Sequence, residues 1–252
     1  MKCLLTLLAS AVFLTTTTSF AASAPEPQAR LLVDPARSRD IPVLLYAPPS
    51  NAPCQLQKRC AVALLSAGYG LKPGDYAFLA NTLIELGYLV VAVQHELPSD
   101  PPISTSGDLF TNRLPMWQRG ADNLRFVRQS LAQTDSDYDW NQLLLIGHSN
   151  GGDISALVLT QNPDFANTLV TLDHRRYPLP RDTQLKVLSI RASDFEADPG
   201  VLPQQSAQNG SQCITTIAGS HHNDMNDYGP APLKAEITQR LLQFLQDGQC
   251  GL

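Results

Sequence analysis

The sequence contains few charged residues and no excess of basic ones. Charged side chains make up 16% of the 252 residues, and the formal net charge at pH 7 is -5. Binding to nucleic acid or to an anionic membrane surface draws on clusters of Lys and Arg. We therefore expect neither as a partner. A composition this low in charge is more typical of an exported enzyme than of a charged scaffold.

Long apolar runs are also missing, because no stretch after the first residues reaches the about 18 apolar residues that span a bilayer. Residues 1–22 begin with a short basic region, continue as an apolar stretch and end in small residues. This pattern predicts a secretory signal peptide cleaved near Ala21 or Ala22. The remainder, 23–252, is long enough for a single α/β domain, and we expect it to be periplasmic or secreted.

Cysteine is scarce, with 5 residues in the chain, of which Cys3 belongs to the predicted signal peptide. An even number in an exported chain indicates disulfides, and four cysteines allow three pairings. We predict Cys54–Cys60, which closes a short loop before a strand, and Cys213–Cys250, which joins a late strand to the C-terminus. The alternative is a zinc site, which the spacing and the shortage of nearby histidines disfavour.

The sequence shows no internal repeat and no linker to a second domain. Strand-like and helix-like patterns alternate instead, which predicts an α/β fold with a mostly parallel central sheet and helices on both faces. We expect 94–113 to be a long polar loop that forms a wall of the site. The predicted strands lie at 31–33, 41–46, 60–65, 88–93, 143–146, 169–172, 185–190 and 214–218, and the predicted helices at 76–87, 117–131, 153–161 and 233–245.

The most informative segment is 143–152. Four apolar residues predict a short buried strand, the motif Gly-x-Ser-x-Gly follows at 147–151, and apolar residues at helical spacing come next. Strand, tight turn and helix form the context of a nucleophile elbow, in which small residues flank a strained serine. Ser149 is therefore the candidate nucleophile, and the start of the helix behind it favours negative charge.

A serine hydroxyl needs a base to take its proton and a third group to orient that base. His222 is our candidate base, because it follows the last strand and completes the chain order Ser…acid…His. Its neighbour His221 is the alternative. His148 lies inside the elbow and is expected to point away from the serine, and the remaining histidines, His95 and His174, follow other strands.

Three aspartates are candidates for the orienting acid. Asp173 ends the strand after the elbow helix, whereas Asp194 and Asp198 follow the next strand, which is the commoner place for the acid in folds of this kind. Asp198 lies in a turn-like segment and could simply bond to its own backbone. The tips of both strands are expected near the serine, so position along the chain leaves all three open.

An oxyanion hole requires two backbone N–H groups aimed at one point. We expect Asn150, the residue after the nucleophile, to supply one of them. The other is expected from Tyr69, in the glycine-containing turn after the strand at 60–65. Ester hydrolysis by such a site uses no cofactor and no metal, and we expect none.

At these residues the chain resembles the α/β-hydrolases. More narrowly, it is similar to the plasma-type platelet-activating-factor acetylhydrolases and to the dienelactone-hydrolase-like exported proteins. The similarity covers most of 23–252 and departs from the pattern at Ala67, a place often held by His. The similar segments are 147–152 around the serine, 172–179 around the acid and 219–227 around the histidine.

The resemblance implies that Asp173 is the acid, ahead of Asp198 and Asp194, and that His222 is the base. It also implies hydrolysis of carboxylic esters by a Ser-His-Asp triad through an acyl-enzyme. Lids in this fold are commonly inserted after the strand that Asp173 ends, and the stretch there is short. We therefore expect no large lid and an open site, which suits small-molecule esters with short acyl groups or bulky, exposed esters.

Two other functions remain open from the sequence. One is a metal-binding protein, whose oxygen-rich cluster could hold Ca²⁺ although it lacks a recognised loop pattern. The other is a non-catalytic ligand-binding protein on a hydrolase fold. Arg175 and Arg176 could hold an anionic group of a substrate, but such a pair more often forms surface salt bridges. The residues of the candidate metal site are His221, His222, Asp224 and Asp227.

Overall fold

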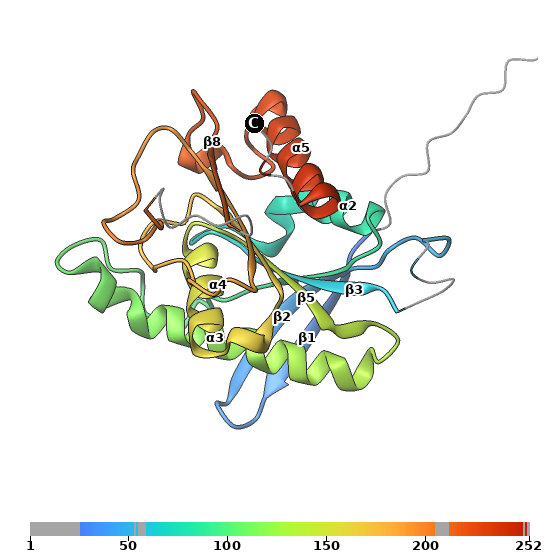
Figure 1. Cartoon of the computed structure of the whole chain (residues 1–252). Coiled ribbons are helices and arrows are strands. Elements are labelled where there is room, and N and C mark those ends of the chain that lie inside the picture. The colour runs from blue at the N-terminus through green and yellow to red at the C-terminus, as the bar shows by residue number, and fades with distance from the viewer. Residues whose placement is uncertain (1–25, 53, 55–58, 205–211, 249, 251–252) are drawn as a thin grey trace, which may run out of the picture.

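The computed structural model describes residues 26–52, 54, 59–204, 212–248 and 250. The predicted signal peptide and its cleavage site lie outside these residues. Within them, the chain forms one open sheet of eight strands with helices on both faces (Figure 1). In chain order the strands are β1 (Gln28–Asp34), β2 (Arg39–Tyr46), β3 (Ala61–Ser66), β4 (Leu89–Val93), β5 (Asp139–His148), β6 (Thr168–Leu172), β7 (Lys186–Arg191) and β8 (Gln212–Thr216).

The sheet is mostly parallel, as the alternation of strands and helices predicts. Its strands lie in the order β1-β2-β4-β3-β5-β6-β7-β8, and each neighbouring pair from β4 to β8 is parallel. β2 is antiparallel to both of its neighbours, and only a short turn joins it to β1. The carboxyl ends of the six parallel strands therefore meet at one edge of the sheet.

The helices form a layer on each face of the sheet. α3 and α4 pack on one face, and α2 and α5 pack on the other (Figure 1). In the part of the chain that the structure describes, no helix combines the length and the hydropathy needed to cross a membrane. The helical elements are η1 (Pro73–Tyr76), α2 (Ala77–Glu85), α3 (Leu109–Thr134), α4 (Asn150–Gln161), η2 (Pro163–Phe165), η4 (His222–Asp224) and α5 (Ala231–Asp247).

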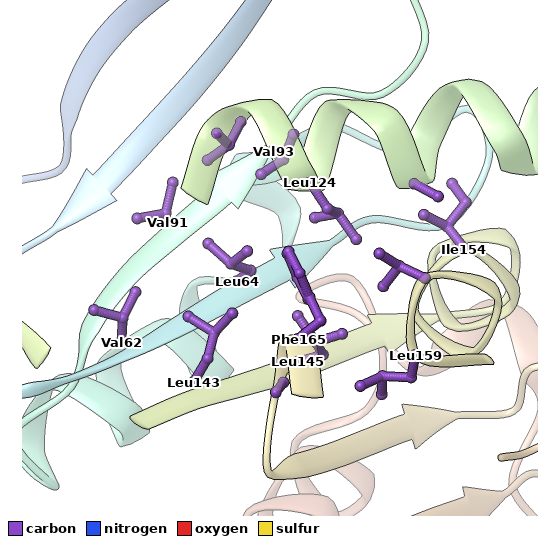
Figure 2. Close-up of a cluster of buried hydrophobic side chains, with 14 of the residues drawn as sticks. Val62, Leu64, Val91, Val93, Leu124, Leu143, Leu145, Ile154, Leu159 and Phe165 are labelled. Atoms are coloured by element: carbon purple, nitrogen blue, oxygen red, sulfur yellow. The ribbon is translucent and has the colours of Figure 1, made fainter. Parts of the chain in front are cut away.

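The central strand β3 shows why both faces of the sheet are covered. Successive side chains of a strand point to opposite faces. Val62 and Leu64 accordingly pack with Leu124 under α3 and α4 (Figure 2), whereas Ala63 and Leu65 pack under α2 and α5. Full burial of a Val or Leu side chain stabilises the fold by about 1.5–3 kcal/mol. The unbroken apolar run of β3 therefore builds two cores at once and holds the strand ends in place.

The segment 94–113 differs from the expected long loop. Only 94–108 is irregular, because α3 begins directly after it. Asp108 caps this helix by accepting hydrogen bonds from the backbone N–H of Thr111 at 3.2 Å and from its hydroxyl at 2.7 Å. The first turns of α3 are largely exposed and contain Pro115, so no apolar stripe marks them in the sequence.

Both predicted disulfides are present. Cys54–Cys60 lies before β3, and Cys213–Cys250 joins β8 to the chain after α5. These four thiols are all paired, so none of them can bind zinc, and the alternative of a zinc site built on them is wrong. Disulfides persist in oxidising compartments, so the two bridges are consistent with export.

Candidate active site

Ser149 stands in the turn between β5 and α4, at the carboxyl edge of the sheet. Its backbone has φ 51° and ψ -119°, a conformation that residues with a side chain rarely adopt. A Cβ atom added to Gly147 would lie 2.4 Å from the carbonyl oxygen of Gly151, and one added to Gly151 would lie 2.1 Å from that of Ser66. Glycine is therefore required at both positions for the turn to pack against its own strand and against β3.

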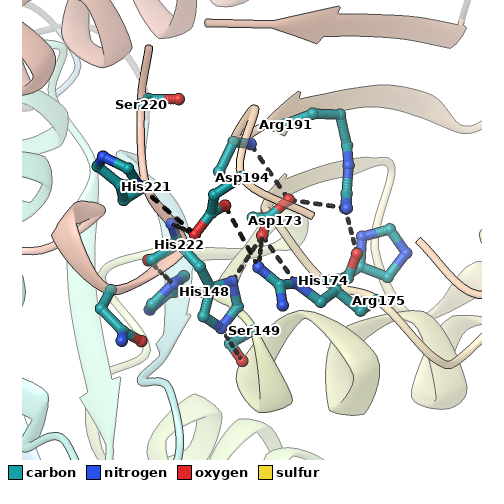
Figure 3. Close-up of polar contacts among 12 residues, drawn as sticks. His148, Ser149, Asp173, His174, Arg175, Arg191, Asp194, Ser220, His221 and His222 are labelled. Carbon is teal, nitrogen blue, oxygen red and sulfur yellow. Dashed lines mark hydrogen bonds and ion pairs between the residues drawn. The ribbon is translucent and has the colours of Figure 1, made fainter. Parts of the chain in front are cut away.

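Ser149, His222 and Asp173 come together from three separate loops (Figure 3). Ser149 Oγ lies 2.9 Å from His222 Nε2, and His222 Nδ1 lies 2.6 Å from Asp173 Oδ2. Asp173 directly follows β6, and His222 begins η4 in the loop after β8. These loops meet because β5, β6 and β8 run in the same direction and end at the same edge.

The carboxylate of Asp173 is fully buried among several donors. Its Oδ1 accepts the backbone N–H of Ala192 at 3.1 Å and lies 2.7 Å from Arg191. Its Oδ2 accepts a hydrogen bond from Arg175 at 2.7 Å in addition to that from His222. Burial by itself raises the pKa of Asp173, but the hydrogen bond from His222 and the two arginines outweigh it and lower the pKa to about 2. The group is therefore ionised at neutral pH.

The other two candidate acids have different partners. Asp194 Oδ2 accepts the backbone N–H of His222 at 3.0 Å, so this carboxylate holds the histidine loop and not the ring. Asp198 forms an ion pair with Arg176 at 2.9 Å, and its side chain is 45% exposed. Asp173 is thus the carboxylate that faces the ring of His222, although it follows β6 and the other two follow β7.

Arg175 and Arg176 are engaged with carboxylates of the protein itself. Arg175 lies 2.7 Å from Asp173 and 3.5 Å from Asp194, and Arg176 pairs with Asp198. The interpretation of this pair as a salt-bridged surface therefore fits the structure better than a free site for an anionic substrate group.

The four residues of the alternative metal site do not converge. The carboxylate of Asp227 accepts the backbone N–H groups of Ala77 and Phe78 at the start of α2, at 2.7 and 3.0 Å. The ring of His222 is already engaged by the serine and the aspartate. Among the residues that the structure describes, no group of three or more His, Cys, Asp or Glu side chains is arranged to hold a metal ion.

The remaining histidines occupy different surroundings. His221 has a side chain that is 67% exposed, and His95 and His174 are buried. His148 was expected to point away from the serine, and its Nε2 lies 3.0 Å from the backbone carbonyl oxygen of His222 (Figure 3). The sequence around His148 does not reveal this contact, because the contact joins the end of β5 to a residue 74 positions later in the chain.

The two residues expected to form the oxyanion hole follow the ends of two neighbouring strands, β3 and β5. Asn150 is the first residue of α4 and is buried, and Tyr69 lies in the turn after β3, which is next to β5 in the sheet. Gly68 already donates its backbone N–H to the hydroxyl of Tyr76 at 2.9 Å. The next N–H along this turn is that of Tyr69.

The side chain of Asn150 has two partners that the sequence analysis missed. Trp117 Nε1 donates a hydrogen bond to its Oδ1 at 2.8 Å, and its Nδ2 donates to Glu96 Oε1 at 2.9 Å. Burial raises the pKa of Glu96 to about 7 in spite of the hydrogen bond from Asn150, which lowers it. One signal for Glu96 was present in the sequence, since an acidic residue closely follows the buried strand β4 at the edge where the other candidates lie.

The stretch between β6 and β7, residues 173–185, contains no helix or strand. The absence of helices and strands from 173–185 agrees with the expectation that the fold carries no large lid there.

No protein-family model and no curated protein matches the sequence. Solved structures do match the fold. The ferulic acid esterase of Streptomyces cinnamoneus is 20% identical with a TM-score of 0.60, over 83% of this chain and 78% of that one. Butyrate-bound esterase 2 of Thermogutta terrifontis is 14% identical with a TM-score of 0.62, over 90% and 96%. A lidless α/β serine hydrolase of Xanthomonas campestris is 16% identical with a TM-score of 0.58, over 92% and 98%.

At these identities the likeness shows the fold and does not carry over a substrate. The narrower similarity to the plasma-type platelet-activating-factor acetylhydrolases is not tested by these structures and stays a prediction. The aligned regions nevertheless span most of this chain and most of each esterase or hydrolase. The chain therefore has the α/β-hydrolase fold.

Proposed function

We propose that this protein is an exported serine hydrolase that cleaves carboxylic esters, with Ser149 as nucleophile, His222 as base and Asp173 as orienting acid. One observation carries the proposal. A hydrogen-bonded chain runs from Ser149 Oγ through both ring nitrogens of His222 to Asp173, with separations of 2.9 and 2.6 Å. Both separations are within the range needed for a serine and its base. The strained position of the serine at a strand-to-helix turn supports the same assignment.

In the first half of the reaction, Ser149 Oγ attacks the acyl carbon while His222 Nε2 accepts the hydroxyl proton. The ionised Asp173 stabilises the resulting imidazolium. Its hydrogen bond to Nδ1 also holds the ring in the tautomer that leaves Nε2 free to accept. His222 then gives its proton to the departing alkoxide, and the acyl group remains on Ser149 as an ester.

A water molecule attacks this acyl-enzyme in the second half, and His222 again acts as the base. The C–O bond to Ser149 then breaks, His222 returns a proton to the serine, and a carboxylic acid leaves. The net reaction converts an ester and water into an alcohol and an acid. These steps need only the side chains named and two backbone donors.

The backbone N–H groups of Asn150 and Tyr69 are proposed to hold the negative charge that develops on the acyl oxygen. The N-terminus of α4 adds a favourable dipole at the same place. Removing one donor from an oxyanion hole typically lowers turnover by about 10²–10³-fold. Loss of the side-chain contacts that hold Asn150 should therefore lower turnover even though its side chain does not meet the substrate.

We propose small-molecule esters with short acyl groups, or bulky exposed esters, as the substrate class. The stretch at 173–185, which has no helix or strand, supports an open site. Two similar structures are a ferulic acid esterase and an esterase with bound butyrate, and both names are compatible with this class. Export is supported by the leader pattern at 1–22 and by the two disulfides.

Labelling with a fluorophosphonate followed by intact-mass measurement tests the nucleophile. We expect one adduct on the wild-type protein and none on Ser149→Ala, which removes only a small hydroxyl and should retain its circular dichroism spectrum. Turnover of p-nitrophenyl acetate should be abolished in the same variant. Near-normal turnover by Ser149→Ala would refute the serine mechanism.

A panel of esters tests the substrate class. Acetyl, butyryl, octanoyl and feruloyl esters, together with a platelet-activating-factor-type acetyl ester, cover the alternatives. We expect the highest kcat/KM for the short acyl groups, and a preference for octanoyl esters would contradict an open, short-acyl site. Loss of activity with a chelator would favour the metal-binding alternative, and the absence of any adduct or turnover would favour the non-catalytic binding protein.

A further inference from the structure

His148 occupies the first variable position of the Gly-x-Ser-x-Gly motif, and the residue is only 3% exposed. It contacts two other parts of the site. Nε2 lies 3.0 Å from the backbone carbonyl oxygen of His222 (Figure 3), and Nδ1 lies 2.7 Å from the hydroxyl of Tyr76. The centroids of the imidazole rings of His148 and His222 are 4.9 Å apart. His148 therefore links the strand that carries the serine to the loop that carries the base.

The direction of each hydrogen bond follows from the chemistry of the groups. A carbonyl oxygen can only accept, so Nε2 of His148 must carry the proton that it donates to His222. Burial, reinforced by the nearby His222, lowers the pKa of His148 to about 3, so the ring is neutral and Nδ1 carries no proton. Nδ1 therefore accepts the hydroxyl proton of Tyr76, whose oxygen in turn accepts the N–H of Gly68.

In each of these hydrogen bonds the donor lies on the side of the turn after β3 and the acceptor lies on the side of the loop that carries His222. Tyr76 is 1% exposed, and burial raises its pKa, so its hydroxyl remains protonated and able to donate. A Cβ atom added to Gly68 would lie 2.8 Å from His148 Nδ1, so glycine is needed for this approach. Gly68 also precedes Tyr69, the proposed oxyanion donor. One chain of contacts thus joins the turn that contains Gly68 to the loop of His222.

We propose that His148 is a positioning residue that is held in its Nε2–H tautomer by Tyr76, and that fixes the loop of His222 at hydrogen-bond distance from Ser149. The kinetic part of this inference rests on the proposed serine mechanism. His148 acts through the backbone of His222 and exchanges no proton with the substrate. Its neutrality is required because a second positive charge beside His222 would oppose the imidazolium that forms during the reaction.

Nitrogen NMR of the histidine rings tests the arrangement without an activity assay. We expect His148 to carry its proton on Nε2 and to show no titration between about pH 5 and about pH 9, because its pKa is about 3. A proton on Nδ1, or a titration near neutral pH, would overturn the inference. These spectra give an answer even for an inactive protein, so a failure of the proposed function is recognised separately.

A matched pair of variants tests the effect on the reaction. In His148→Gln the terminal amide can still donate to the carbonyl of His222, whereas in His148→Asn the shorter side chain reaches only toward Tyr76. With p-nitrophenyl acetate we expect His148→Asn to lose on the order of 10²-fold in kcat with KM nearly unchanged, the cost of a misplacement of about 1 Å. His148→Gln should recover most of this loss. Equal kcat values in the two variants would refute a positioning role.

Leu131→Ala controls for a general loss of stability. Leu131 is buried near the C-terminal end of α3, and its truncation should lower Tm without changing kcat. If Leu131→Ala lowers kcat as much as His148→Asn does at a similar Tm, the effect of His148 is structural and the inference falls. Proton NMR provides a further readout, because the proton between His222 Nδ1 and Asp173 Oδ2 should give a downfield signal. This signal should persist in His148→Gln and be lost in His148→Asn. Persistence in both variants would also count against the inference.

Discussion

The two sides of the proposed active site use opposite electrostatics. On the acid side, Arg175 and Arg191 surround Asp173, and with the hydrogen bond from His222 they overcome burial and lower its pKa to about 2. On the oxyanion side, burial dominates and disfavours charge. It lowers the pKa of His148 to about 3 and raises that of Glu96 to about 7.

This difference follows from what each side has to do. In the proposed mechanism, the acid side must stabilise a positive charge on His222 when it takes the serine proton, so a permanent carboxylate is useful there. The oxyanion side only has to hold backbone N–H groups in place, and neutral hydrogen bonds achieve this without adding a charge that would disturb the reaction. Substitutions that remove a charge should therefore affect turnover and the free energy of unfolding differently on the two sides.

The largest effect is expected for Asp173→Asn. Turnover should fall by on the order of 10³–10⁴-fold, because an amide does not hold the tautomer or stabilise the imidazolium. The free energy of unfolding should also fall, by up to about 3–5 kcal/mol, since Arg191 is left buried without its charge partner. Steady-state kinetics and urea unfolding measure the two effects. Full activity in this variant, with Asp194→Asn or Asp198→Asn inactive, would contradict the assignment.

Arg191→Met removes one of the two cations on the acid side and should act mainly on stability. We expect a loss at or below the lower end of the about 3–5 kcal/mol typical of broken buried pairs, because Arg175 remains. The pKa of Asp173 should rise. In the wild type that pKa lies below the unfolded value, so its stabilising contribution is present above about pH 4 and is lost as pH falls toward about 2.

The difference in unfolding free energy between wild type and Arg191→Met should therefore be largest near neutral pH and should shrink in acid. Urea unfolding at a series of pH values measures it. A difference that does not change with pH would show that the ion pair with Asp173 is not its source.

Glu96→Gln tests the oxyanion side. The pKa of Glu96 is raised above its unfolded value, so this group favours the folded state most at low pH, and the benefit is lost as pH rises through about 7. Gln retains an oxygen that can accept from Asn150 but cannot ionise. The variant should match the wild type at about pH 5 and be more stable by on the order of 1–3 kcal/mol at about pH 8. A variant less stable than the wild type at the higher pH would contradict burial as the dominant influence.

The smallest effect is expected for Asp198→Asn. Its carboxylate is 45% exposed and pairs with Arg176 at the surface, so the stability change should be below about 1 kcal/mol. Turnover should stay close to the wild-type value. This variant is the matched control for Asp173→Asn, because both remove a carboxylate that is paired with arginine while only one faces His222.

Features that depend on neighbouring residues were predictable from the sequence. The apolar run of β3 and the glycines around Ser149 are local patterns, and they indicated the buried strands and the strained turn where the structure has them. The pairing of the four cysteines followed from their spacing and from the strands beside them. The start of α3 was not predictable in this way, because its exposed first turns and Pro115 leave no periodic pattern of apolar residues in the sequence.

Contacts between distant segments required the tertiary structure. Asp173, Asp194 and Asp198 all lie near strand ends, and only the direction of each side chain shows that one faces the ring of His222 while another caps its backbone. The partners of Asn150 and the contact of His148 with His222 likewise join segments more than thirty residues apart. Local sequence determined which residues are candidates for the reaction, whereas the order of parallel strands determined which of them meet, because that order brings remote strand ends to one edge of the sheet.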